Sequence, residues 1–304
     1  MSKVAFIKSA DRKYNIYRSL SLIKSEIISG VRNANNIVIK PNCVITDYQL
    51  AATHVDAIDS ILEFITPYSK NQITIAEGTA IGETLTAFKN YNYFSLQAKY
   101  GFTIVDLNYD QFSHLNLYDK KGNFWSAQVS KTLINSDYVI SICPPKTHNE
   151  VVYSGAIKNV VVGSLLRARS KIKSFIANRI GIVRNNKSMI HQGYKYTNQN
   201  LFTLANYIKI NLAVIDGYAA MQGDGPGFKG ELVPSHWSVA SSSALNADIL
   251  ASSLMGIKLS DIGYLTLLND NQKTGEPFVI GDNWKDSIQK FKMHSNFEKQ
   301  RHWK

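Results

Sequence analysis

The residues best suited to chemistry follow an apolar run, Asp137–Cys143, that predicts a buried strand. Pro144-Pro145 stiffens the exit of this strand, so the side chains after it have little conformational freedom. An ammonium, a hydroxyl and an imidazole then follow in succession, from Lys146, Thr147 and His148. We interpret these residues as groups that bind an anion and transfer protons. Ordinary solvated loop residues are the alternative.

Lys158 is a second candidate, because it lies in an otherwise apolar and small-residue run, Gly155–Gly163. Partial burial would lower the pKa of Lys158 and make it a base, a Schiff-base amine or a carboxylate anchor. The alternative is an edge lysine with a buried stem and a solvated ammonium. Asn159, the next residue, is a candidate for substrate binding.

Polar residues also end other strand-like runs. Lys40 and Asn42 flank Pro41 after one such run, and we predict that both contact substrate. Glu77 follows the next run and could orient a lysine or histidine. His54 begins a helix, where exposed N–H groups favour anions.

The second half of the chain supplies three more candidates. His191 is a third imidazole that could move protons. Asp216 ends a short apolar strand, and the glycine-rich segment after it includes Gly225. Such a segment either lets backbone N–H groups approach an anion or forms a tight turn. We include Asp216 and Gly225 among the predicted substrate-binding residues.

Strands alternate with helices along the chain, which predicts an α/β fold with a mostly parallel sheet and flanking helices. Ligands of such sheets collect beyond the carboxyl ends of the strands, where the candidates lie. Strands are predicted at residues 3–8, 36–40, 72–76, 102–107, 137–143, 212–215 and 236–240, and helices at 14–29, 53–65, 83–100, 201–209 and 244–255. We predict an N-terminal α/β lobe (1–165), a basic excursion over the active face (166–200) and a C-terminal α/β portion that completes the core (201–304).

The net charge of +11 is concentrated in one part of the chain. No Asp or Glu occurs between Glu150 and Asp216, and ten Lys and Arg residues fall in that interval. A basic stretch of this kind could bind nucleic acid, an anionic surface or an acidic protein, and we place such contacts at residues 167–195.

Several classes of site have no support in the sequence. Two cysteines, Cys43 and Cys143, are too few for a four-cysteine iron–sulfur or zinc site, and we expect both to be buried. The HExxH, GxSxG and GxGxxG motifs are missing, so a metal site is weakly supported and the cofactor stays unknown. No stretch approaches the roughly 20 apolar residues of a membrane span, and Met1–Lys13 does not look like a secretory signal. We therefore expect a cytoplasmic protein.

The motif residues resemble the family labelled domain of unknown function 362. The shared blocks are Ile39–Asn42, Thr53-His54, Pro145–His148, Ser154–Asn159, and Asp216-Gly217 with Gly223–Pro226. Many members carry ferredoxin-like cysteine motifs, which this chain lacks. A weaker likeness is to the nickel-pincer lactate racemases, and it implies that Lys158 is a cofactor tether or base and His148 an acid–base group.

Three functional hypotheses follow. In the first, an enzyme of the isomerase or lyase type binds a carboxylate or phosphate through Lys40, Lys146 and Lys158 while His148 and His191 move protons. In the second, the acid-free stretch binds nucleic acid or an anionic surface. In the third, the chain is a redox protein, and the basic face of this stretch docks an external iron–sulfur protein that supplies electrons.

Overall fold

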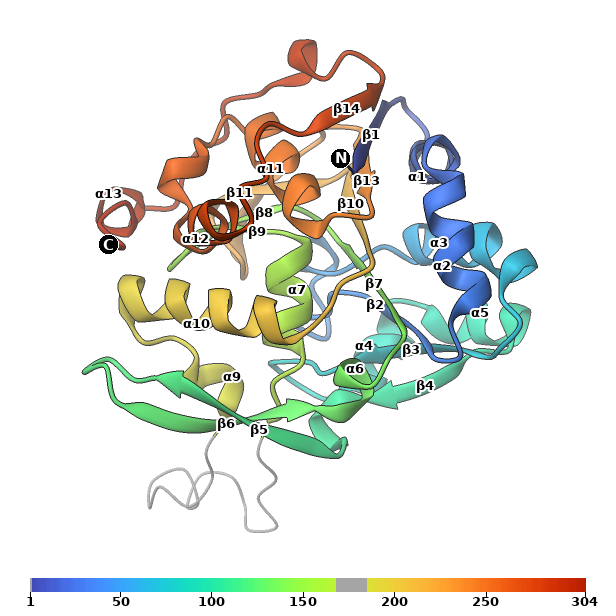
Figure 1. Cartoon of the computed structure of the whole chain (residues 1–304). Helices are drawn as coiled ribbons and strands as arrows, with labels where there is room; N and C mark the ends of the chain where they lie inside the picture. Colours follow the sequence, from blue (N-terminus) through green and yellow to red (C-terminus); the bar gives the residue numbers. More distant parts are fainter. Residues whose placement is uncertain (1, 168–184) are drawn as a thin grey trace.

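An eight-stranded sheet runs through the centre of the computed structural model, which describes residues 2–167 and 185–304 (Figure 1). Its strands are parallel except β13, which is antiparallel to both of its neighbours. The prediction of an α/β fold with a mostly parallel sheet is confirmed. In spatial order the strands are β14 (Phe278–Gly281), β1 (Lys3–Lys8), β13 (Trp237–Ser241), β10 (Leu212–Gly217), β7 (Tyr138–Cys143), β2 (Ile37–Lys40), β3 (Ile73–Glu77) and β4 (Thr103–Asp106).

Each central strand contributes to two apolar cores, because successive side chains point to opposite faces of a sheet. In β7, Val139 and Cys143 belong to one core, whereas Ile140 and Ile142 belong to the other. The second core is covered by α1 (Arg12–Leu22), α2 (Lys24–Asn33), α3 (Val55–Ile65), α4 (Thr84–Asn90) and α5 (Tyr93–Tyr100). The first is covered by α6 (Lys131–Ile134), α7 (Ala156–Gly163), α9 (Asn186–Met189), α10 (Gly193–Tyr207), α11 (Ala244–Leu254) and α12 (Gly263–Gln272) (Figure 1).

Two smaller sheets complete the fold. The hairpin of β5 (Phe112–Tyr118) and β6 (Phe124–Ser130) lies beside the first core. A four-stranded sheet has the order β12 (Lys229–Val233), β11 (Ala220–Asp224), β8 (Lys146–His148) and β9 (Val152–Ser154). The short helix α13 (Phe297–Gln300) lies near the C-terminus. The sequence pattern predicted neither smaller sheet, since their strands are short or half-exposed.

Three predicted helices have different bounds in the structure. The helix expected at 14–29 is divided into α1 and α2 at Ile23, whose backbone is not helical. The helix expected at 83–100 is divided into α4 and α5, because Asn92 adopts a left-handed conformation that asparagine tolerates. Helix α10 begins at Gly193, eight residues before the predicted start.

The main sheet contains strands from both predicted α/β portions. Strands β1, β2, β3, β4 and β7 come from residues 1–165, and β10, β13 and β14 come from residues 201–304. The two portions therefore share one sheet and its cores. Among the described residues, no helix is long and apolar enough to cross a membrane.

Helix α7 is held at its N-terminus by the buried carboxylate of Asp248 in α11. The backbone N–H groups of Ala156 and Ile157 donate to this carboxylate at 2.7 and 2.9 Å. The Tyr153 hydroxyl donates to it at 3.2 Å. A Cβ atom on Gly155 would lie 2.1 Å from the same carboxylate, so glycine is required where the chain enters the helix. The contact fixes α7, which carries Lys158, against the C-terminal portion.

We predict that Asp248→Ala lowers the free energy of unfolding by about 2–4 kcal/mol, because two buried N–H groups of α7 lose their acceptor. Urea unfolding followed by circular dichroism measures the change. Asp270→Ala, at an exposed position of α12, is the matched control and should change stability by less than about 0.5 kcal/mol. Equal stability of the two variants would contradict the anchoring role of Asp248.

Candidate functional site

The candidate site lies at the edge where the carboxyl ends of β7, β2 and β3 meet. These strands are neighbours in the sheet, so the residues that end them lie side by side. Lys40 ends β2 and Glu77 ends β3. After β7, Pro144-Pro145 leads directly into β8, which carries Lys146 and His148. The residues that end or follow these three strands therefore lie at one edge of the sheet, where ligands of parallel sheets bind.

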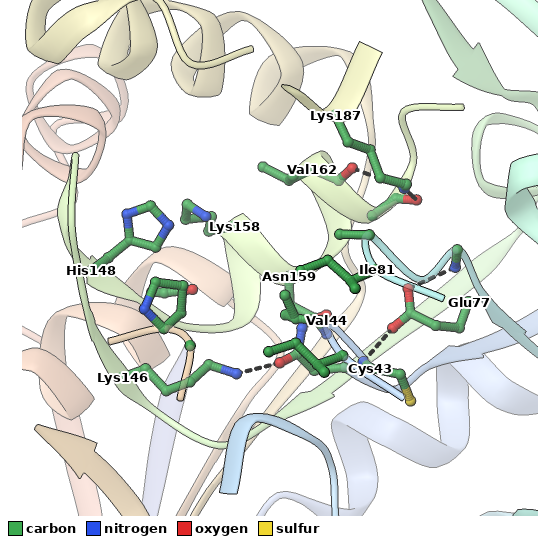
Figure 2. A pocket seen from close by; sticks show the side chains of 18 of the residues that line it. Cys43, Val44, Glu77, Ile81, Lys146, His148, Lys158, Asn159, Val162 and Lys187 are labelled. Atoms are coloured by element: carbon green, nitrogen blue, oxygen red, sulfur yellow. Dashed lines mark hydrogen bonds between the residues drawn. The ribbon is translucent and has the colours of Figure 1, made fainter. Parts of the chain in front are cut away.

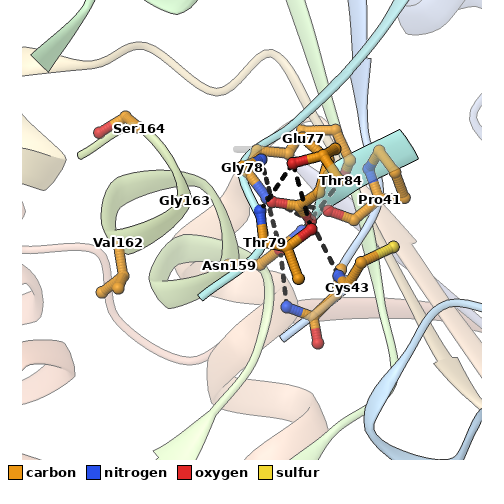
Figure 3. Close-up of polar contacts among 12 residues, drawn as sticks. Pro41, Cys43, Glu77, Gly78, Thr79, Thr84, Asn159, Val162, Gly163 and Ser164 are labelled. Atoms are coloured by element: carbon orange, nitrogen blue, oxygen red, sulfur yellow. Dashed lines mark hydrogen bonds and ion pairs between the residues drawn. The ribbon is translucent and has the colours of Figure 1, made fainter. Parts of the chain in front are cut away.

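A buried ion pair between Lys40 and Glu77 forms the floor of the site. The Lys40 Nζ atom lies 2.9 and 3.0 Å from the two carboxylate oxygens. It also donates to the Asn159 side chain at 3.1 Å. The backbone N–H groups of Cys43 and Gly78 donate to Glu77 at 2.8 and 2.7 Å (Figure 3). Both charges are satisfied by protein groups, so Lys40 has a structural partner in Glu77.

Asn159 connects this ion pair to helix α7. Its Nδ2 atom donates to the Lys40 carbonyl at 3.1 Å and to the Ser141 hydroxyl at 3.0 Å. Close packing of the helix on Lys40 requires Gly163, because a Cβ atom there would lie 2.0 Å from the Lys40 side chain. The amide and the glycine thus place Lys158, which precedes Asn159, at the rim of the floor.

A cavity of about 370 Å³ opens above this floor (Figure 2). Charged, polar and apolar residues line this cavity. They are Lys40, Asn42, Cys43, Val44, Ile45, Glu77, Ile81, Lys146, His148, Asn149, Glu150, Ser154, Lys158, Asn159, Val162, Lys187, His191 and Pro226.

Three buried lysines of the cavity form no ion pair with any residue of the described ranges. They are Lys146, Lys158 and Lys187, and we call them the unpaired lysines. Lys146 donates to Asn42 and to the Ala51 carbonyl. Lys158 has no hydrogen-bond partner among the described residues. Each retains donor capacity toward the cavity, because an ammonium has three N–H groups.

Burial changes the acid–base behaviour of these amines. It lowers the pKa of Lys146 to about 8. Burial, and then the neighbouring Lys146 ammonium, lower the pKa of Lys158 to about 7. Burial likewise lowers the pKa of Lys187 to about 7. Near neutral pH, Lys158 and Lys187 are thus divided between the ammonium and the free amine.

Two imidazoles lie beside the unpaired lysines. The rings of His148 and His191 are stacked, with centroids 5.9 Å apart and an interplanar angle of 4°. Burial and then the charge of Lys158 hold the pKa of His148 well below its usual value, so this imidazole is neutral. Its Nδ1 atom accepts the Glu150 backbone N–H at 3.1 Å, which places the ring proton on Nε2.

Glu150 holds the second imidazole. Its carboxylate lies 3.1 Å from the Nδ1 atom of His191 and accepts the Thr197 hydroxyl at 2.7 Å. Burial alone would raise the pKa of Glu150, but the contacts with His191 and Thr197 outweigh it and lower this pKa.

Most of the predicted site residues lie together around the cavity. They are Lys40, Asn42, Lys146, His148, Lys158, Asn159 and His191. Their chemical roles stay predictions, because proximity does not assign a reaction. Cys43 and Cys143 are buried and free, as expected, and burial raises the pKa of both thiols.

Three predicted substrate-binding residues do not line the cavity. Thr147 lies between two cavity residues of β8, and its side chain points to the other face, where it donates to the Gly223 carbonyl at 2.8 Å. Gly225 packs so closely on Thr147 that a Cβ atom would lie 2.7 Å from its carbonyl oxygen. Asp216 is paired with Arg12 at 3.1 Å. These positions support the fold around the site.

A smaller cavity of about 220 Å³ contains the Asp216–Arg12 pair and His54. His54 begins α3, and its Nδ1 atom accepts the backbone N–H of Asp56 at 3.2 Å. Burial, and then the charge of Arg12, lower the pKa of His54. His54 therefore caps a helix beside this cavity and does not line the larger one.

Sequence reasoning missed Glu150 and Lys187 as members of the site. Glu150 is the last acid before the acid-free interval, two residues after His148, which was a usable signal. Lys187 had no such signal, since it was one of ten basic residues in that interval.

Part of the predicted basic excursion, residues 168–184, lies outside the described residues. The proposed nucleic-acid or acidic-protein contacts through 167–195 fall largely in that segment. In the part of the chain that the structure does describe, no three His, Cys, Asp or Glu side chains are grouped as metal ligands.

Comparisons with known proteins give a family and distant structural likenesses. The profile of a family described as a domain of unknown function (DUF362) matches residues 37–253. No curated protein matches. The lactate racemase apoprotein from Thermoanaerobacterium thermosaccharolyticum is 15% identical, with a TM-score of 0.44 over 71% of this chain and 50% of that chain. A DUF89 family protein from Pyrococcus horikoshii is 12% identical, with a TM-score of 0.25 over 53% and 48%. The chain spans about half the length of each.

We predict that the stability of the protein rises between pH 7 and pH 10, because Lys158 releases its proton near pH 7 when folded but near pH 10.5 when unfolded. Below pH 7 both states are protonated and the buried charge opposes folding in full. Lys158→Met should therefore raise the free energy of unfolding by about 1–3 kcal/mol at pH 6 and reduce its rise with pH, to which Lys187 contributes in the same direction.

Urea unfolding at several pH values measures this effect. Lys258→Met is the matched control, because Lys258 is exposed and its variant should keep the wild-type slope. A Lys158→Met variant that is less stable than wild type at pH 6 would show that the Lys158 ammonium is compensated within the protein.

Proposed function

This chain belongs to the DUF362 family, and we propose that it is an enzyme that moves a proton on a small carboxylate- or phosphate-bearing substrate, in a reaction of the isomerase or lyase type. The observation that carries the proposal is the set of unpaired lysines in one cavity. Buried cations attract an anion far more strongly than solvated ones do, because little water screens them. A bound acid group would supply the negative charge that the protein does not.

Lys158 is the proposed base. Its amine is free of hydrogen bonds to the described residues, and a pKa of about 7 leaves much of it unprotonated near neutral pH. A base of this kind can remove a proton from the carbon next to an acid group. The negative charge that develops would be stabilised by the Lys146 ammonium, which is fixed by Asn42 and the Ala51 carbonyl.

His148 is the proposed hydrogen-bond donor to the substrate, and His191 is the proposed proton donor. The Nε2–H of neutral His148 can donate a hydrogen bond to a substrate oxygen. His191, which contacts Glu150, can return a proton during the reaction. A hydrogen-bond donor and a proton donor beside one base are suited to removing a proton and replacing it elsewhere.

Exchange with heavy water tests this function. We predict that the protein, incubated in D2O with a panel of hydroxy acids, oxo acids and sugar phosphates, incorporates deuterium next to the acid group of at least one compound. Proton NMR measures the loss of the C–H signal. His148→Asn should slow this exchange by about 10²–10⁴-fold, since the Asn oxygen can still accept the Glu150 N–H but the shorter amide places no donor at the position of Nε2.

His114→Asn and Lys258→Met are the controls. His114 is exposed on β5, where it contacts Ser126, and Lys258 is exposed outside the cavity. Both variants should exchange at the wild-type rate, whereas Lys158→Met should not. No exchange with any compound, or exchange that survives in both His148→Asn and Lys158→Met, would refute the proposed reaction.

A further inference from the structure

The cavity contains more unpaired positive charge than a single acid group would balance. Its carboxylates, Glu77 and Glu150, already contact Lys40 and His191. The unpaired lysines are thus left with hydrogen bonds to neutral protein groups or with none. Even with Lys158 acting as a neutral base, a ligand with one negative charge would leave either the Lys146 or the Lys187 ammonium uncompensated.

The unpaired lysines lie at two separate places along α7. Lys158 is in the first turn of the helix. The Lys187 Nζ atom donates to the carbonyls of Val162 and Gly163, at 3.4 and 2.9 Å, where the helix ends. Gly163 follows Lys158 by five residues, which corresponds to about 7.5 Å along a helix that rises ~1.5 Å per residue. Figure 2 shows Lys146 and Lys158 on one side of the cavity and Lys187 on the other.

Apolar side chains form part of the cavity wall. Val44, Ile81 and Val162 line the cavity, beside the polar Asn159 (Figure 2). A polar group against this wall would lose its hydrogen bonds to water without gaining new ones. The middle of a well-fitting ligand is therefore a short hydrocarbon segment.

We infer that the ligand carries two acid groups joined by a short apolar spacer, one bound by Lys146 beside the base Lys158 and the other by Lys187. This inference rests on the proposed function and names its substrate class. A volume of about 370 Å³ is at the small end of ligand sites, so the spacer is only a few carbons long. Linear dicarboxylates and phosphono-carboxylates share this chemistry.

Calorimetric titration at pH 6.5, where the lysines are largely protonated, tests the inference. The probes are malonate, succinate, glutarate and adipate, each compared with the monocarboxylate of equal chain length. We predict that the best dicarboxylate binds at least about tenfold more tightly than its monocarboxylate, since the second contact is intramolecular. If the natural ligand carries a phosphate, 3-phosphonopropionate should bind more tightly than succinate. If the natural ligand is a dicarboxylate, succinate should bind more tightly.

Lys187→Gln should reduce the tenfold preference to about threefold or less, because glutamine can still donate to the helix carbonyls but has no charge. Lys292→Gln is the matched control, since Lys292 is an exposed partner of Glu231, and it should keep the full preference. If Lys187→Gln does not fold by circular dichroism, the comparison of chain lengths in the wild type decides.

The possible failures are distinguishable. Equal affinity for mono- and dicarboxylates in the wild type, or an unchanged preference in Lys187→Gln, would overturn the two-acid ligand and leave the proposed function standing. A protein that binds none of the probes, with one acid group or two, would overturn both.

Discussion

The buried ion pair of Lys40 and Glu77 is the interaction on which the rest of the site depends. Two neighbouring parallel strands end in opposite charges, and the backbone of the following residues and Asn159 satisfy both groups. Burial of a charge pair is tolerated when every donor and acceptor has a partner, as here. The pair thereby fixes β2, β3 and α7 relative to one another without adding net charge to the cavity.

The unpaired lysines are the opposite case, because their burial opposes folding. The two apolar cores on either side of the main sheet contribute the compensating stability. Residues that line a cavity and lower the stability of the folded protein are typical of functional sites, because their charges are available to bind a ligand. This contrast distinguishes Lys158 from Lys40, although both are buried lysines that line the same cavity.

Sequence patterns predicted the main sheet, except for its edge strand β14, and most of the residues that line the cavity. Long apolar runs such as the one before Pro144 identify buried strands, and parallel strands bring their carboxyl ends to one edge. Asp216 also ends a strand but does not line the cavity. Its position in the sequence does not indicate to which face of the sheet its side chain points. The sequence analysis did not predict strand β8, which has three residues and no detectable pattern, and so it did not predict that the Thr147 side chain points away from the cavity. The position of Lys187 in the cavity depends on contacts with residues distant in the sequence, which local residue spacing does not predict.

Strand β8 has one further consequence, which concerns entropy. Backbone pairing with β9 on one side and β11 on the other holds Lys146 and His148 before any ligand arrives. Long side chains such as lysine ordinarily lose rotamer freedom when they bind, and that loss weakens affinity. The hydrogen bonds of the Lys146 ammonium to Asn42 and to the Ala51 carbonyl complete part of that ordering when the chain folds, so a small molecule with few contacts can still bind selectively.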